Sequence, residues 1–243
     1  MSGYFINIFL VLCIGFSSFA QNDIKSIEEL EKETPKDSVS YKTAYGFRLG
    51  ADISKPIISF LDDTYSGLEL VADYRIKKNW YIATELGYEE KIVEEDFTTS
   101  TSRGTYIRLG ANLNLYKNWL DMNNEVYVGG RYGFSIFEQE LNDFTPNVTD
   151  ATFTDYFGTT TISPDISETG LSMHWFEFQL GAKVETFKNL FVSFSTAFKV
   201  ALSVKEPDNF AVLYAPGFNR VYSSKTGFGF NYTLSYLIPF KKK

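Results

Sequence analysis

The sequence has very little of the chemistry that metal and thiol sites require. Its 243 residues contain one cysteine, Cys13, and one histidine, His174. Zinc is usually held by a set of cysteine and histidine ligands, and thiol catalysis needs an accessible cysteine in the mature chain. A zinc, haem or thiol site is therefore excluded, and we expect no cofactor.

The first 20 residues carry no charge. The apolar run "YFINIFLVLCIGF" ends in "SSFA", where Ser18, Phe19 and Ala20 have the small-x-small form of a signal-peptidase site. The pattern predicts a signal peptide over residues 1–20, which would remove Cys13. The basic segment that usually precedes such a run is missing, so a retained N-terminal membrane helix is the alternative. Residues 21–43 hold six acidic and four basic residues and are interpreted as a charged periplasmic linker.

The rest of the chain lacks helical periodicity and instead alternates apolar with polar residues at period two, which is typical of strands. The predicted strands are Tyr45–Ile53, Leu68–Ile76, Trp80–Tyr88, Ile107–Leu115, Val126–Ile136, His174–Val184, Leu190–Val200 and Phe228–Phe240. The continuous aromatic face would aggregate in water but fits the lipid side of a closed sheet. We therefore predict an all-β fold over residues 44–240, an eight-stranded antiparallel up-and-down transmembrane β-barrel of outer-membrane type, followed by a basic tail at 241–243.

The polar face of these strands collects charges of both signs. The residues predicted to form a lumen charge network are Arg48, Asp52, Glu69, Asp73, Arg75, Glu85, Glu89, Arg108, Arg131, Glu177, Lys183, Glu185 and Lys199. An eight-stranded barrel is only wide enough for side chains to fill. Seven acids and six bases are nearly balanced, which favours mutual pairing and a plugged barrel. The alternative is a narrow polar channel, where one sign of charge would dominate.

Lys-Asn pairs recur in "KKNW", "YKNW" and "FKNL", at residues 77–80, 116–119 and 187–190. They fall between predicted strands 2 and 3, 4 and 5, and 6 and 7, whereas the other connections are a dozen to over thirty residues long. Short turns on one side and long loops on the other are typical of outer-membrane barrels. We assign the Lys-Asn turns and both termini to the periplasm, and we expect asparagine in the left-handed conformation there. Nearby aromatic residues would form an interfacial girdle: Trp80, Tyr116, Trp119 and Phe187.

Two long segments are candidates for binding a partner. Residues 138–170 carry seven acids and no base, and residues 209–222 are apolar and interrupted by Pro and Gly. Aromatic residues on long loops form plausible docking surfaces, and buried cover over the barrel mouth is the alternative. The candidate partner-binding residues are Phe144, Phe153, Tyr156, Phe157, Leu213, Tyr214 and Phe218.

Several longer motifs occur in order between residues 44 and 240. They are "YGFRLGADISKPI", "DYRIKKNWYIATELG", "YKNWLDMNN", "VGGRYGFSIF", "HWFEFQLGAKVE", "LYAPGFNR" and "GFGFNYTLSYLIPF". Through these motifs the chain resembles an uncharacterised outer-membrane β-barrel family, a domain of unknown function, of Gram-negative Bacteroidota. The resemblance implies a small outer-membrane barrel and supplies no activity and no active-site residues. Such barrels usually end in an aromatic residue, whereas here Phe240 is followed by three lysines.

Catalysis has one candidate pair, Ser172 and His174, because some small outer-membrane barrels modify lipid A. In lipid A deacylases the histidine comes before the serine, and no acidic third member is predicted nearby, so an interfacial role for His174 is favoured.

We predict a non-catalytic structural or accessory subunit of a larger outer-membrane complex, such as barrel-assembly, lipoprotein-export or secretion machinery. A lipid A-modifying enzyme and a small pore or adhesin are the alternatives. The expected partners are outer-membrane lipids, lipopolysaccharide and other outer-membrane proteins or surface lipoproteins, with no nucleic acid.

Overall fold

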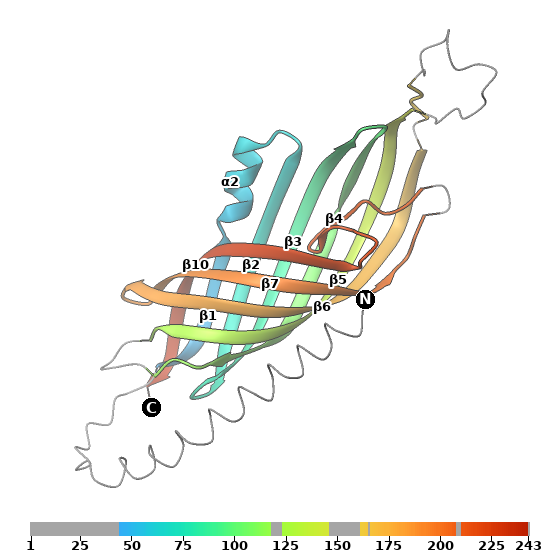
Figure 1. The fold of residues 1–243 in the computed structure, drawn as a ribbon. Helices are drawn as coiled ribbons and strands as arrows, with labels where there is room; N and C mark the ends of the chain where they lie inside the picture. The colour runs from blue at the N-terminus through green and yellow to red at the C-terminus, as the bar shows by residue number, and fades with distance from the viewer. Residues whose placement is uncertain (1–43, 118–122, 146–160, 165, 208–209, 243) are drawn as a thin grey trace, which may run out of the picture. The chain divides into compact units, whose positions relative to one another are not determined.

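Eight long strands close into one antiparallel barrel (Figure 1), seen here in a computed structural model that describes residues 44–117, 123–145, 161–164, 166–207 and 210–242. The barrel strands are β1 (Ala44–Asp52), β2 (Tyr65–Lys77), β3 (Trp80–Glu95), β4 (Thr98–Asn114), β5 (Glu125–Phe144), β6 (Ile166–Phe187), β7 (Leu190–Val204) and β10 (Thr226–Lys242). Three short elements lie in the connections: α2 (Ser54–Leu61), β8 (Tyr214–Ala215) and β9 (Asn219–Arg220). The predicted signal peptide, the linker and Trp119 lie outside the described residues.

Neighbours in the chain are neighbours in the barrel, and β1 closes the ring by pairing with both β2 and β10. This confirms the predicted eight-stranded up-and-down fold. The register pairs Ala44 with Lys242, so the barrel begins and ends at the same end as the Lys78–Asn79 and Lys188–Asn189 turns. We call this the turn end, and the opposite end the loop end.

The outer face of the barrel is apolar because alternate side chains of every strand point away from the lumen. On β7 every outward residue from Val192 to Leu202 except Thr196 is apolar, over a stretch of the length that a tilted strand needs to cross a bilayer. Large exposed residues of this face include Leu70, Tyr74, Ile82, Leu86, Leu109, Tyr132, Phe176, Phe178, Leu180, Phe194, Phe198, Phe230 and Tyr232. An apolar exterior around a polar interior is the arrangement of barrels that span membranes.

No helix in the described part of the chain is long and apolar enough to cross a membrane.

The strands β3 to β6 continue well past the apolar stretch at the loop end (Figure 1). The prediction of a long loop between the third and fourth strands is wrong, because a turn at Asp96–Phe97 joins β3 directly to β4. The sequence does not predict this extension because most of its outward positions are polar, as in Glu90, Thr101 and Glu138, and the alternation with apolar residues is lost. Side-chain hydrogen bonds such as Thr101 to Asn142 link the strands there instead.

The turn end fits the Lys-Asn prediction in part. Asn189 adopts the left-handed conformation (φ 66°), as expected, whereas Asn79 is not among the residues with positive φ. Glu185 corrects the predicted lumen set: it is half-buried, and its carboxylate accepts hydrogen bonds from the Asn189 backbone N–H (2.8 Å) and the Asn123 amide (3.0 Å). It lies at the end of β6, so its side chain closes the following turn instead of reaching the lumen.

Candidate functional site

The buried charged side chains of the described residues gather in the barrel interior. Of the thirteen residues predicted to line it, all except Glu185 are buried. Two further charged residues join them: Glu125, at the start of β5, and Lys55, from α2. The prediction missed Glu125 because it started that strand one residue late, and it missed Lys55 because no helix was expected.

Arg108 on β4 is the centre of the interior network. Its guanidinium lies 2.6 Å from the Glu69 carboxylate on β2, 3.1 Å from Glu85 on β3 and 3.4 Å from Glu177 on β6. The Glu85 carboxylate is also ion-paired with the Arg131 guanidinium on β5, at 3.1 Å. Buried charges of this kind are stable only when they are paired, and one guanidinium here joins carboxylates from three other strands across the lumen.

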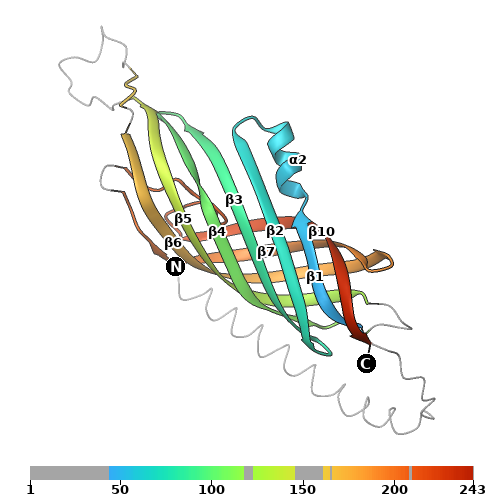
Figure 2. The same ribbon diagram turned by 180° about the vertical axis from the view of Figure 1, so that it is seen from behind.

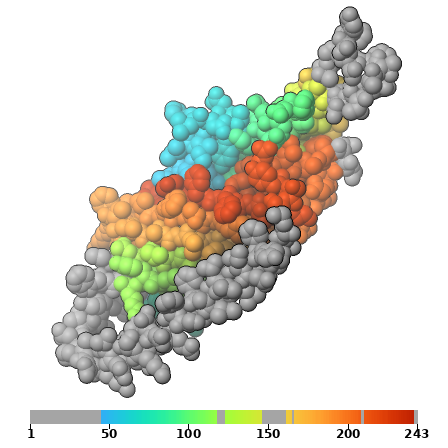
Figure 3. Space-filling model, viewed as in Figure 1, coloured from blue at the N-terminus to red at the C-terminus, as the bar shows by residue number. Residues whose placement is uncertain are grey.

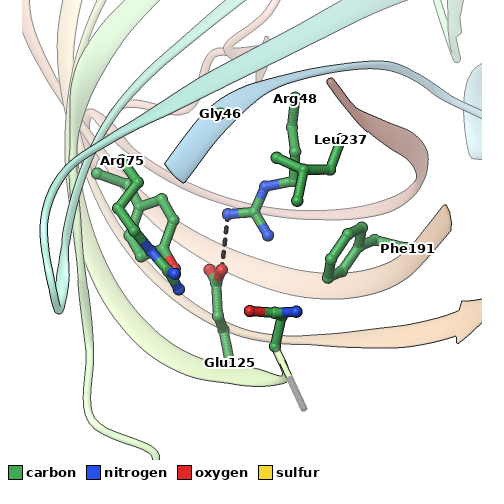
Figure 4. Close-up of a pocket in the computed structure, with 8 residues that line it drawn as sticks. Gly46, Arg48, Arg75, Glu125, Phe191 and Leu237 are labelled. Carbon is green, nitrogen blue, oxygen red and sulfur yellow. Dashed lines mark hydrogen bonds and ion pairs between the residues drawn. The ribbon is translucent and has the colours of Figure 1, made fainter. Parts of the chain in front are cut away.

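A second group of paired charges closes the turn end (Figure 4). The Arg48 guanidinium lies 2.6 Å from both Asp73 and Glu125, and its carbon sits 4.8 Å and 4.9 Å from the ring centres of Tyr81 and Phe191. Arg75 donates to the Tyr81 hydroxyl and lies over the same ring. Stacking of a guanidinium on aromatic faces adds to its attraction to carboxylates. The side chains therefore fill this mouth of the barrel.

The loop end is closed by the segment between β7 and β10, which folds back over the lumen. We call residues 211–221 the lid. Glu89 on β3 accepts hydrogen bonds from the Tyr214 hydroxyl and from the Gly217 N–H, both at 2.8 Å. Lys199 on β7 donates to the Gly217 carbonyl at 2.7 Å. One buried ion of each sign thus holds the tip of the lid.

An apolar cluster packs beneath the lid. Phe218 is fully buried with its ring edge-on to Trp175 at 6.0 Å, and further members are Tyr106, Phe137, Leu171, Met173, Ala201, Val212 and Ala215. Gly217 has φ +79°, and a Cβ there would lie 2.5 Å from the Tyr106 ring. Only glycine fits both the backbone conformation and the close approach.

The Tyr214 hydroxyl keeps its proton. Burial raises the pKa of Tyr214 well above its ordinary value, and the nearby Glu89 carboxylate raises it further because a phenolate would be repelled. The hydroxyl therefore remains a donor to Glu89 at neutral pH.

These contacts correct the docking interpretation of residues 209–222. Tyr214 and Phe218 are buried in the barrel mouth and Leu213 is half-buried, so this segment is cover for the mouth. Phe144, at the end of β5, is also half-buried. The other candidate docking residues, Phe153, Tyr156 and Phe157, lie outside the described residues.

Cavities in the described part of the lumen include two small ones. The one at the turn end, between Arg48 and Glu125, has a volume of about 10 Å³, and the one beside Arg108 and Arg131 has about 40 Å³. The smaller has room for about one water molecule. A wide aqueous path does not fit this interior.

Ser172 and His174 lie on the outer face of β6, away from the lumen. The His174 ring stacks on Phe134 at 4.6 Å, and its Nδ1 hydrogen-bonds the Tyr132 hydroxyl at 2.6 Å. The interfacial role expected for His174 stays a prediction, with which this aromatic setting agrees. The described residues contain no group of histidine, cysteine and acidic side chains able to hold a metal ion.

Comparison with known proteins places the chain by family and supplies no activity. No curated protein matches the sequence. Among solved structures, one that matches is Ail, the attachment invasion locus protein of Yersinia pestis, at 10% identity and a TM-score of 0.38, covering 81% of this chain and 95% of Ail. The family model for DUF6048, a domain of unknown function, matches residues 1–243, so the chain belongs to this family.

Proposed function

We propose that the protein is a non-catalytic outer-membrane barrel that acts as a structural or accessory subunit of a larger outer-membrane assembly. The observation that carries this proposal is the interior: paired charges fill the turn end and the middle, and the lid covers the loop end. Because the interior of such a barrel is closed, its outer face, its rims and its projecting strands are the surfaces that can contact other molecules.

The apolar outer face supports a location in the outer membrane of a Gram-negative bacterium, and the sequence resemblance favours a member of the Bacteroidota. In this proposal the turn end and both termini face the periplasm. The extended strands β3 to β6 then project from the cell surface into the lipopolysaccharide layer, where the acidic loop-end residues meet its divalent cations and surface lipoproteins.

The assembly partner can be sought by affinity purification of the full-length protein from its native membranes after mild cross-linking. We expect a defined set of outer-membrane proteins or lipoproteins to co-elute. Replacing residues 146–160 by a short Gly-Ser linker should weaken that co-elution, while heat-modifiable migration in gels, a sign of the folded barrel, is retained.

Absence of any co-eluting protein, together with an unchanged variant, would remove the accessory-subunit proposal. If intact cells instead lost binding to other cells when residues 146–160 were replaced, an adhesin would be the better interpretation. The projecting sheet of β3 to β6 is the feature that favours this second candidate, because it carries surface beyond what crossing a bilayer requires.

A further inference from the structure

The barrel has a seam at the loop end because β1 is only nine residues long. Its last pair with β10 is Asp52 to Thr233, and its last pair with β2 is Ala51 to Leu70. Beyond these pairs, residues 226–232 of β10 form a ladder with β7, and residues 65–69 of β2 form a ladder with β3. Two strand edges therefore face each other with no strand between them.

The helix α2 lies in this seam. Figure 2 shows it continuing from the end of β1 beside β2. The backbone N–H of Ile53, just before the helix, donates to the Tyr232 carbonyl of β10 at 2.7 Å. On the other side, the Gly67 N–H of β2 donates to the Ser59 hydroxyl at 2.9 Å. The segment thus supplies hydrogen-bond partners to both open edges, which a bilayer interior could not do.

The polar side of α2 faces the barrel. The Ser54 N–H and hydroxyl donate to Asp52 at 2.8 Å and 2.6 Å. Lys55 is ion-paired with Glu89, the same carboxylate that holds the lid, and lies 3.7 Å from Glu69. These positions, with Ser59, follow the spacing of one helix face. That face is therefore held by the interior charge network.

The other side of α2 is apolar and faces outward. Ile53, Ile57, Phe60 and Leu61 follow the i, i+4, i+7, i+8 spacing of one face and are 38%, 53%, 86% and 76% exposed. A helix on a protein in water has the opposite arrangement, with its apolar stripe toward the core. Figure 3 shows α2, in cyan, as a raised surface at one end of the barrel.

The outward face of α2 is continuous with the apolar exterior of the strands. The bond from Ile53 to Tyr232 places the start of the helix at the level of an outward-facing tyrosine, and the bond from Gly67 to Ser59 places its middle beside Leu68. Leu68 is exposed, and so are Phe228 and Phe230 on the opposite edge. Exposed apolar residues therefore occur on β10, on α2 and on β2 along this seam.

We propose that α2 seals the seam between β10 and β2 from within the membrane, and that its Ile53–Leu61 face contacts the acyl chains of the leaflet at the loop end. The partner is lipid hydrocarbon. This inference rests on the proposed membrane location and adds a non-strand element to the wall of the barrel. The same helix keeps the edges of β2 and β10 from pairing with strands of other proteins.

Site-directed fluorescence quenching tests the proposal. Single cysteines are introduced by Phe60→Cys, Leu180→Cys and Glu94→Cys in a Cys13→Ser background, labelled with bimane and refolded into phosphatidylcholine vesicles with or without brominated acyl chains. Leu180 is an outward strand residue and Glu94 an exposed residue of the extended sheet. We expect brominated lipid to quench the label at position 60 as strongly as that at 180, and to leave the label at 94 unchanged.

The outcomes separate this proposal from the membrane location on which it rests. Quenching at 180 without quenching at 60 would overturn the lipid role of α2 and leave the membrane barrel in place. A disulfide between two copies at position 60 would also overturn it, since a second chain would then cover the helix. Quenching at neither position would contradict the membrane location itself. Leu61→Cys, whose side chain is also largely exposed, repeats the test if the label at 60 prevents folding.

Discussion

Replacing Arg108 by methionine is expected to destabilise the barrel severely. Methionine has a similar length and no charge, so the carboxylates of Glu69, Glu85 and Glu177 would lose the guanidinium that joins them. Breaking a buried pair by removing one partner costs about 3–5 kcal/mol, because an uncompensated charge remains in a low-dielectric site. With three carboxylates affected at once, we expect the loss in free energy of unfolding to reach the upper part of that range.

Arg103 on the same strand is the matched control. It is also paired with a glutamate, Glu138, but its side chain is 48% exposed on the outer surface of the extended sheet. Exposed pairs are screened by water and salt and contribute little to stability. We therefore expect Arg103→Met to leave the unfolding transition almost unchanged.

The assay is urea-induced unfolding of both variants in lipid vesicles, followed by tryptophan fluorescence and by heat-modifiable migration. Adding Glu69→Gln to Arg108→Met should recover part of the lost stability, since one unpaired charge is removed. Equal effects of Arg108→Met and Arg103→Met would show that the interior ion pairs contribute no more to stability than those at the surface, contrary to this prediction.

Three further outcomes are expected. Phe218→Ala should cost about 3–5 kcal/mol, the usual range for removing a buried aromatic ring, whereas Phe228→Ala, at a position 75% exposed, should cost much less; similar losses in urea unfolding would show that the lid is not packed as described. In intact cells, an impermeant thiol reagent should label a cysteine introduced at Asn147 and not one at Asn79, and the reverse would overturn the orientation. His174→Ala should leave lipid A acylation unchanged by mass spectrometry, and an altered acylation pattern would restore the enzyme alternative.

The strand pattern could be predicted because each strand has one face toward an apolar exterior and the other toward the polar lumen. Outward positions such as Leu180 and Phe178 meet an apolar environment, and inward positions such as Glu177 and Gln179 meet the polar lumen. Consecutive residues therefore alternate between apolar and polar, and this alternation can be recognised in the sequence. Most of the inward charges followed directly from this period. Their individual partners could not be predicted, because Arg108 reaches carboxylates on three strands whose relative heights depend on the register of the closed barrel.

The elements that could not be predicted lie where outward and inward residues no longer alternate between apolar and polar. Beyond the apolar exterior, β3 and β4 continue through residues that are mostly polar on the outward face, so the sequence predicts a long loop where the structure has a turn at Asp96. Helix α2 contains a proline and spans fewer than three helical turns, which is too short to show a helical period in the sequence. The position of the lid depends on Glu89 and Lys199, which are distant from it in the sequence.

Single-channel recording of the purified protein in planar bilayers distinguishes a closed barrel from a channel. The Arg48 and Arg108 ion pairs fill the lumen and the lid covers its loop end. We predict insertion without steady conductance over the physiological range of voltage and salt. A stable, reproducible open channel in the unmodified protein would contradict a closed barrel that acts through its outer surfaces.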